Sequence, residues 1–450
     1  MFKNILGLAL LFISQLSIAQ NVSKCNTTFL VNQSVTEDSR NYYAMEEVAN
    51  KNNQWVTENN NIEKSVITVP IVVHIIYRQT HANVGSGTNI SNAQIEDAIR
   101  ILNEDFSKTN SEFPNPPRNT FINLAADAQL QFCLAATDEN GNPTSGVTRT
   151  STTKTNFDAD TESNDMKKNN TGGKDGWDPQ KYLNIWVCDL TNSGSGGMTL
   201  GYSYLPGSVA WSMWKDGLVV DYRYFGTIGV SAAGNDGKTP THEIGHYLGL
   251  MHTFCESTDS QGNPTCCDND DNNWGGYVDD TPASKDIYWG NVDASTNNNT
   301  CNDISYNNNF TTNVLDMDEN FMAYSTDTWM FTTEQVGVMN GTMNGYRNSL
   351  KNSTAEVNCT GIINGFNNLL NNNQIRIYPN PTEGRIMIQN LNNLKAEKII
   401  VRNILGEVVY SKKLNNHLTT LNISHVENGI YFIEISTENG LRIEKIILSK

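Results

Sequence analysis

The chain has 450 residues, eight of them cysteine, and a formal net charge of −17 at pH 7. This length is enough for more than one domain. The strong negative charge argues against nucleic acid as a partner. The charge is uneven: residues 375–450 hold ten Lys and Arg against seven Asp and Glu, a net +3 that leaves −20 for the rest. An acidic body suits calcium or cationic peptide substrates, although neither follows from charge alone.

Residues 1–19 have the features of a secretory signal peptide. Lys3 precedes the apolar run from Ile5 to Ile13, and Ser17-Ile-Ala19 ends in a small residue before Gln20. A membrane anchor is the alternative, but the run is too short to span a bilayer. We therefore expect cleavage after Ala19 and a mature protein that is exported without a transmembrane segment.

Residues 20–64 form a polar segment that contains one helical patch, around Tyr42–Val48, and one cysteine, Cys25. The first folded element of the next region is expected at Ser65–Tyr77, where β-branched residues indicate a buried strand. Ser91-Asn-Ala-Gln94 has the spacing of a helix capping box, and four apolar residues at helical intervals follow it. Further strands are expected at Leu130–Thr137, Leu183–Leu190, Leu200–Leu205 and Leu218–Phe225.

The run His242-Glu-Ile-Gly-His-Tyr-Leu-Gly-Leu-Met-His252 carries the most specific chemical signal in the chain. His242 and His246 would project from one face of a helix that begins near Pro240, so both can reach one metal ion. Gly249 lets the backbone leave the helix, and that turn would bring His252 to the same ion. A lone HExxH occurs by chance on ordinary helices with surface histidines, but the extended form is far more specific.

This ligand set predicts catalytic zinc. Three neutral imidazoles suit Zn²⁺ and leave its fourth tetrahedral position open for water. Glu243, beside the first ligand, could take a proton from that water as it attacks a peptide carbonyl and pass it to the leaving amine. The strands, the connecting helix and the zinc helix together predict an α+β catalytic unit.

Export makes the cysteines candidates for disulfides. Four of them crowd the loops after the zinc motif, and we expect two bridges of unspecified pairing among Cys255, Cys266, Cys267 and Cys301. Cys133 and Cys188 lie in apolar, strand-like runs. They are either a bridge between adjacent strands or two buried thiols.

The composition of the sequence changes beyond residue 350. Residues 351–374 are rich in Asn and read as a linker. Alternating apolar residues, punctuated by Gly and Asn, then predict a small antiparallel, Ig-like β-sandwich over residues 375–450. This part has no cluster of metal-ligating residues and is predicted to be an accessory domain.

The extended zinc motif and the later run Asn320-Phe-Met-Ala-Tyr324 resemble the metzincin metallopeptidases. Within that clan, the chain resembles the pappalysin (cytophagalysin) family over roughly residues 65–350. Further matching motifs are Val69–His74, Tyr182–Trp186, Gly245–Phe254, Asp279–Pro282 and Phe331–Gln335. The resemblance implies a metzincin-type catalytic domain with a mixed, twisted sheet, and protein or peptide substrates.

The resemblance also implies roles for single residues. Met322 would form a hydrophobic base beneath the zinc, and Tyr324 would hydrogen-bond the oxyanion of the tetrahedral intermediate; the alternative is a core methionine and a packed aromatic ring. Relatives that cut before arginine have an acidic residue in the S1′ pocket, and the turn often carries an acid where this chain has Ala323. Asp327 is close enough in sequence to substitute for it.

The loop from Cys267 to Thr281 holds five aspartates, and family members bind calcium here. The EF-hand pattern is not met, so a merely solvated acidic loop is the alternative. Asp279, Asp280 and Thr281 are the expected calcium ligands.

Cys25 is a candidate for a cysteine switch in which its thiolate fills the open position of the zinc and keeps the precursor latent. A disulfide with Cys359 or another leftover cysteine is the alternative. Activation would require a cut between about residues 50 and 68, with the bond after Lys64 as the candidate.

The tail, with Tyr378-Pro-Asn-Pro-Thr-Glu-Gly384 and a closing Lys445–Lys450, resembles the C-terminal sorting domain of the type IX secretion system. It implies a Gram-negative source, passage across the outer membrane by that machinery, and a protein released outside the cell or attached to its surface. The sequence thus predicts a secreted zinc endopeptidase made as a latent precursor. The competing hypothesis is a surface adhesin or binding module that kept the fold and the metal without turnover.

Overall fold

The computed structural model describes residues 24–59, 65–192, 198–267, 278–306, 309–359, 375–390, 396–403, 408–412, 418–437 and 440–450. The signal peptide, Lys64, all six aspartates and asparagines of residues 268–273, and residues 360–374 of the expected linker lie outside these ranges. Within them, no helix is both long and apolar enough to cross a bilayer.

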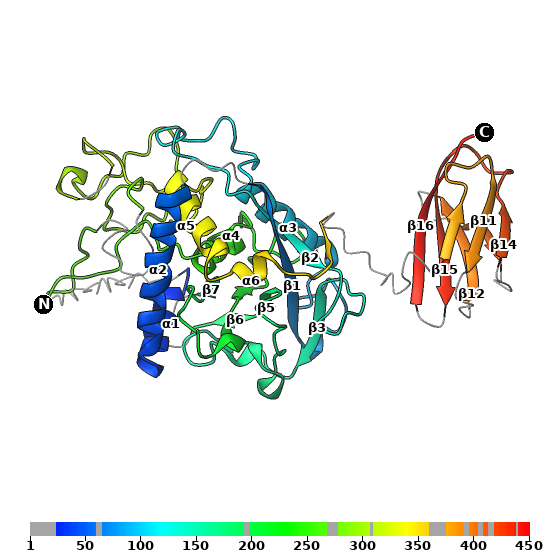
Figure 1. The fold of residues 1–450 in the computed structure, drawn as a ribbon, viewed down its shortest axis with the longest axis horizontal. Helices are drawn as coiled ribbons and strands as arrows, with labels where there is room; N and C mark the ends of the chain where they lie inside the picture. The colour runs from blue at the N-terminus through cyan, green and yellow to red at the C-terminus, as the bar shows by residue number, and fades with distance from the viewer. Residues whose placement is uncertain are drawn as a thin grey trace, which may run out of the picture.

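A mixed sheet organises the larger part of the molecule (Figure 1). Its strands run in the order β7-β8-β5-β1-β2-β9, and β3 pairs with the far half of β1 beyond β2. The strands β1, β2, β3, β5 and β8 are parallel to their neighbours, whereas the edge strands β7 and β9 are antiparallel. The bounds are β1 (Ile67–Arg78), β2 (Leu130–Ala135), β3 (Val147–Thr152), β5 (Leu183–Cys188), β7 (Gly201–Ser203), β8 (Leu218–Asp221) and β9 (Val357–Asn358).

Helices cover the sheet, and shorter elements connect it. The helices of this part are α1 (Thr27–Glu37), α2 (Arg40–Asn59), α3 (Asn92–Phe106), α4 (Thr239–Tyr247), α5 (Thr333–Asn344) and α6 (Asn348–Lys351). A small parallel pair joins β4 (Phe157–Asp158) to β6 (Leu190–Thr191). Single 3₁₀ turns occur at η1 (Gln79–His81), η2 (Asp165–Lys167), η3 (Asn169–Thr171), η4 (Met213–Lys215) and η6 (Asp303–Ser305).

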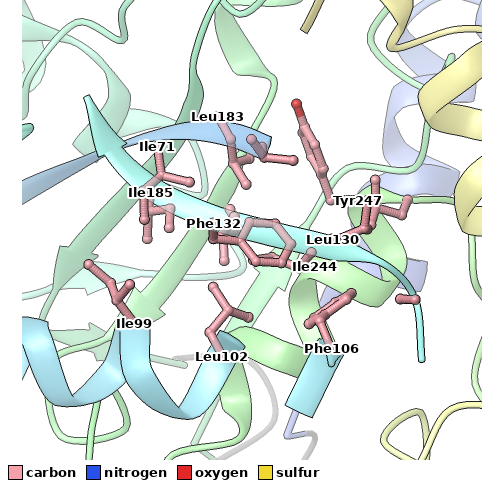
Figure 2. Close-up of a cluster of buried hydrophobic side chains, with 14 of the residues drawn as sticks. Ile71, Ile99, Leu102, Phe106, Leu130, Phe132, Leu183, Ile185, Ile244 and Tyr247 are labelled. Carbon is pink, nitrogen blue, oxygen red and sulfur yellow. The ribbon is translucent and has the colours of Figure 1, made fainter. Parts of the chain in front are cut away.

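The main hydrophobic core lies between the sheet and the helices α3 and α4 (Figure 2). Strand residues alternate between the two faces, so Leu183 and Ile185 of β5 join this core while Trp186 joins a second core on the opposite face. Ile244 and Tyr247 of α4 are fully buried in the main core. The helix that carries the zinc motif is therefore fixed to the sheet by its apolar side.

The expected strands and the two expected helices of the catalytic region are present, with ends that differ by a few residues. At α3, Ser91 caps the helix because its hydroxyl accepts a hydrogen bond from the Gln94 amide at 3.1 Å. The reciprocal half of the capping box is missing, because the Gln94 side chain donates instead to the carbonyls of Tyr222 and Phe225. The sequence signal located the helix start correctly but not the partner of Gln94.

The polar segment before β1 is more helical than predicted. In place of one patch it contains α1 and α2, which together run from Thr27 to Asn59 apart from a short turn. Leu30, Val31 and Met45 are at most 1% exposed because they pack against the catalytic part. Contacts with the catalytic part therefore supply much of the apolar environment of these helices. Such contacts cannot be recognised from the sequence of the segment alone.

Three disulfides are formed among the described residues. The expected pair of bridges after the zinc motif is confirmed, as Cys255–Cys267 and Cys266–Cys301. Both alternatives for the remaining strand cysteines were wrong, because Cys133 on β2 bridges to Cys359, just after β9, and of the two strand cysteines Cys188 alone is a buried thiol. The pairing of β2 with β9 brings the first two together across 226 residues of sequence.

The C-terminal part forms a second unit with a core of its own (Figure 1). One antiparallel sheet has the order β10-β11-β14 and the other β13-β12-β15-β16, as expected for a small β-sandwich. The bounds are β10 (Ile375–Tyr378), β11 (Arg385–Asn390), β12 (Ala396–Asn403), β13 (Val408–Lys412), β14 (Leu418–Asn422), β15 (Gly429–Thr437) and β16 (Gly440–Leu448).

Candidate active site

The candidate site is built on α4 and the turn that follows it. Pro240 lies in the first turn of α4, where its missing N–H costs no helical hydrogen bond. The helix ends at Tyr247, and Gly249 has a φ of +100°, a conformation that side chains disfavour. The Leu250 amide then donates to the Gly245 carbonyl at 3.0 Å, which closes the turn and directs His252 back toward α4.

Three histidines converge at this point. The Nε2 atom of His252 lies 3.2 Å from Nε2 of His242 and 3.1 Å from Nε2 of His246, and all three residues are buried. The sulfur of Cys25 completes the group, with all four ligand atoms within 4.8 Å of one another. Among the residues that the structure describes, no other group of three or more His, Cys, Asp or Glu meets this criterion.

The outer nitrogens of these rings are held by acceptors. Nδ1 of His242 faces the Phe321 carbonyl at 2.7 Å, and Nδ1 of His246 faces the Leu250 carbonyl at 2.8 Å. Since a carbonyl can only accept, both Nδ1 atoms must carry the proton of a neutral ring, and both Nε2 atoms must be unprotonated. Burial lowers the pKa of His242 and His246, which keeps the rings neutral. The lone pairs of the unprotonated Nε2 atoms therefore point toward a common position, an arrangement that can bind a metal cation.

Glu256, which lies outside the zinc motif and was not among the predicted site residues, holds the third ring. Its Oε1 lies 3.3 Å from Nδ1 of His252, which leaves Nε2 of His252 directed at the cluster. Burial opposes ionisation of Glu256, but its close contact with the His252 ring lowers its pKa to about 2. The i, i+4 spacing from His252 was visible in the sequence, but it became informative only once the ring orientation was known.

Glu243 lies beside the cluster and is almost completely buried. Its Oε2 accepts hydrogen bonds from Sγ of Cys25 at 3.5 Å and from Oγ1 of Thr27 at 3.4 Å. Burial raises the pKa of Glu243 to about 8, although these two bonds favour the charged form. A carboxyl with a pKa near neutrality can both accept and return a proton.

Met322 and Tyr324 lie next to the residues of the zinc motif. A Cβ atom at Gly245 would come within 2.3 Å of Sδ of Met322, so the methionine packs directly against the backbone of α4 beneath the histidines. The Tyr324 ring lies against His252, with ring centroids 5.0 Å apart. Its hydroxyl accepts a hydrogen bond from the Cys25 amide at 3.2 Å.

The segment around Cys25 pairs with the edge strand β7. Leu200 donates its amide to the Lys24 carbonyl at 2.9 Å, and Asn26 donates to the Gly201 carbonyl at 3.3 Å, so the segment runs parallel to β7. The Lys24 ammonium donates to the carbonyls of Tyr324 and Ser325. Residues 24–27 therefore cover Glu243 and the histidines.

A cavity of about 300 Å³ opens beside Glu243. Its lining includes Lys24, Asp236, Lys238 and Thr328, but not Asp327, the acid expected in the substrate pocket. Asp327 instead accepts a hydrogen bond from the Val292 amide at 3.2 Å. Asp236 and Glu243 are the acidic residues of the lining.

The expected calcium ligands lie near the start of α5. The two carboxylate oxygens of Asp280 accept from the Thr332 hydroxyl at 2.6 Å and the Glu334 amide at 3.0 Å, and the Asp279 amide donates to Glu334. Thr281 is buried and donates to the Val278 carbonyl at 3.4 Å. Residues 268–277, which hold three of the five aspartates, lie outside the described ranges, so the calcium site stays a prediction.

Two family models match the chain. Residues 164–344 match the pregnancy-associated plasma protein-A peptidase family, and residues 376–449 match the secretion system C-terminal sorting domain. Among curated proteins, an extracellular metalloprotease of Pyricularia oryzae is 29% identical over 49% of this chain and 58% of its own length. One from Verticillium alfalfae is 30% identical over 55% of this chain and 69% of its own length. The chain thus spans little more than half the length of the first of these relatives.

Solved structures of mirolysin from Tannerella forsythia are also similar. A mature form in complex with a cleaved peptide is 34% identical, covers 64% of this chain and 97% of that one, and has a TM-score of 0.53. A promirolysin variant is 30% identical, covers 73% of this chain and 97% of that one, and has a TM-score of 0.55. The chain therefore belongs to the pappalysin family of metallopeptidases and carries a C-terminal secretion sorting domain.

Proposed function

We propose that the chain is the latent precursor of a secreted zinc endopeptidase. The observation that carries the proposal is the convergence of the three Nε2 atoms within 3.2 Å of their nearest neighbours, with Glu243 beside them. The sorting tail supports export to the cell surface or the medium, and the metalloprotease relatives support a peptidase. In this proposal residues 20–64 are the propeptide and residues 65–350 the catalytic domain.

The residues present fit zinc. His242, His246 and His252 would hold the ion through their unprotonated Nε2 atoms, a ligand set that zinc favours in catalytic sites. Bound there, zinc would supply a Lewis acid for the scissile carbonyl and lower the pKa of water from about 15.7 to about 7. The carbonyls of Phe321 and Leu250, together with Glu256, would keep the rings oriented.

The chain's own residues would then move the proton. Glu243, which follows His242 on α4, would accept it from the attacking water and donate it to the leaving amine. The Tyr324 hydroxyl, which binds the Cys25 backbone in the latent form, would be free after removal of the propeptide to donate to the oxyanion.

Latency would come from Cys25. Its sulfur shares the group of ligand atoms with the three histidines, and its hydrogen bond to Glu243 engages the same carboxylate that the reaction needs. With its proton passed to the adjacent Glu243 carboxylate, Cys25 would be the fourth zinc ligand as a thiolate and would exclude water from the site. The alternative disulfide of Cys25 with Cys359 is excluded, because Cys359 is bonded to Cys133.

Calcium, the second expected cofactor, remains part of the proposal as a structural ion near Asp279, Asp280 and Thr281. Its test is thermal unfolding of the zinc-loaded protein at increasing calcium concentration. A rise in Tm that Asp279→Asn abolishes would support the site. An unchanged Tm would leave the acidic loop as solvated surface.

The test of the proposed function is cleavage of a diverse peptide mixture by the processed protein, read by mass spectrometry. Glu243→Ala, carried through the same preparation, is the control. Zinc-dependent cuts that are absent from the variant would establish an endopeptidase, and a lysine or arginine after each cut would point to Asp236 as the pocket acid. No cuts from folded, zinc-loaded protein would favour a binding module.

A further inference from the structure

Helix α2 docks on α5 through a face made of glycine. A Cβ atom added at Gly341 would lie 3.1 Å from Cα of Asn52, and one at Gly337 would lie 3.2 Å from a methyl group of Val56. The two glycines are four residues apart and so lie on the same side of α5. Figure 1 shows α2 beside α5. The absence of side chains at these positions allows the two helices to approach closely.

Two further contacts fix α2 along its length. Near its N-terminus, Met45 is 1% exposed and packs with Leu205 and Met251, the residue before the ligand His252. Gly207 lies under the same turn, because a Cβ atom there would be 2.8 Å from the carbonyl carbon of Ala44. These contacts involve neither Cys25 nor the histidines, so they would persist if the cysteine were released.

At the centre of α2, Asn52 is connected through Thr342 to the turn that follows α4. Its Nδ2 donates to Oγ1 of Thr342 at 2.8 Å, and that hydroxyl donates to the Leu248 carbonyl at 2.8 Å. Oδ1 of Asn52 is buried and has no hydrogen-bond partner among the described residues. A buried acceptor without a partner lowers the stability of an interface. The contact between α2 and α5 is therefore weaker than a fully paired one, as expected if the propeptide must dissociate during activation.

We infer that α2 is an independent anchor, so that cutting the chain between α2 and β1 does not by itself release the propeptide. The cut segment stays bound to the glycine face of α5 and keeps Lys24–Thr27 across the site as a non-covalent inhibitor. Activation then has two stages, a cut and a slower dissociation. The inference rests on the proposed latent protease, but its test does not depend on catalysis.

The experiment uses the full chain with Glu243→Ala, which prevents self-cleavage, and with residues 60–64 replaced by the recognition sequence of a site-specific protease. After complete cleavage, size-exclusion chromatography over time measures how fast the propeptide leaves. We expect it to co-elute with the remainder of the chain, and to do so even when Cys25→Ala removes the sulfur.

Variants of the anchor should accelerate release. Gly341→Ala adds the Cβ atom that meets the backbone of α2, while Ala is the stronger helix former in α5 itself. Met45→Ala changes only the propeptide, so it leaves the sequence of the catalytic part intact. Each variant should raise the dissociation rate at least tenfold, whereas Tyr43→Ala, at an α2 position that is 68% exposed, should leave it within twofold.

Two results would overturn the inference. One is immediate loss of the propeptide from the cleaved Cys25→Ala protein, which would assign retention to the cysteine alone. The other is a dissociation rate that neither Gly341→Ala nor Met45→Ala changes. Failure of the proposed function would appear separately, as absence of peptide cleavage by processed protein with Glu243 intact.

Discussion

The sulfur of Cys25 donates to the carboxylate of Glu243 at 3.5 Å while it also lies within 4.8 Å of the ligand nitrogens of the three histidines. One side chain of the N-terminal segment therefore meets both the metal-binding group and the residue proposed as the general base. Thr27 adds a second hydrogen bond to the same carboxylate oxygen. Because this segment contacts both the metal-binding group and Glu243, it could block both of them at the same time and so keep the site inactive.

Replacing the cysteine tests this arrangement. Cys25→Ala should raise peptide cleavage by the uncut precursor at least tenfold, but not to the level of the processed protein, because Lys24 and Asn26 still pair with β7. Cys188→Ala is the matched control, since Cys188 is also buried and outside any disulfide but lies in the core of the opposite sheet face. Full latency of the Cys25→Ala precursor would contradict the switch.

The role of Glu243 predicts a separation of metal binding from turnover. Glu243→Ala and Glu243→Gln should keep zinc, because the glutamate is not among the grouped ligands, but should lower kcat by about 10²–10⁴-fold. Metal analysis and peptide cleavage on the same processed samples check both statements. Retention of near-normal kcat in either variant would exclude Glu243 as the base.

Glu256 should influence zinc affinity through His252. Glu256→Gln removes the charge that faces Nδ1 of this ring, and loss of such a partner lowers metal affinity by about 10–100-fold. Chelator competition on processed protein measures the change, with the exposed Glu139→Gln as the control. Because the Thr28 hydroxyl also donates to Glu256, the precursor should be less sensitive to the substitution than the processed enzyme. Equal affinities in the variant and the parent would show that His252 is oriented by other contacts.

The zinc motif could be found in the sequence because all its parts lie within eleven residues. The helical spacing of His242 and His246 and the turn at Gly249 are local properties, and α4 and the φ of +100° bear them out. The strands were also predictable, since their buried apolar residues are continuous in the sequence. Their ends were less certain because pairing, rather than composition, decides where a strand stops.

Other features depended on contacts between distant residues. The bridge from Cys133 to Cys359 requires β9 to pair with β2, which nothing near either cysteine indicates. The helicity of α1 and α2 depends on docking of Leu30 and Met45, and the lining of the cavity by Asp236 depends on how its loop folds back. Such residues can be identified only after the fold is known.

The long-range disulfide should contribute to stability. Cys133→Ser or Cys359→Ser opens a loop of more than 200 residues and should lower the free energy of unfolding by about 2–5 kcal/mol. Thermal unfolding under non-reducing conditions measures the effect, and Cys188→Ala, which breaks no bridge, is the comparison. A Tm of Cys133→Ser no lower than that of Cys188→Ala would show that the β2–β9 pairing does not need the bridge.

Asp105 predicts a pH dependence that is independent of the metal. It lies at the end of α3, where the Thr241 hydroxyl donates to its Oδ2 at 2.7 Å and its Oδ1 has no partner among the described residues. Burial raises its pKa to about 7, although the charge of Lys238 opposes the rise. In the unfolded chain its pKa would be about 3.9. The folded state therefore binds the extra proton between these values, and the free energy of unfolding falls as pH rises from about 4 to about 7.

Asp105→Asn replaces the carboxyl with a neutral group of the same shape and should remove this loss. At about 1.4 kcal/mol per pKa unit, the variant should gain of the order of 4 kcal/mol over the parent above pH 7, and nothing near pH 4. Thermal unfolding of both proteins across this range gives the difference directly, so that other titrating groups cancel. Parallel pH profiles for the two proteins would mean that Asp105 ionises freely in the folded state. A gap that opens as pH rises would show that the carboxyl beneath α4 is held neutral by its burial.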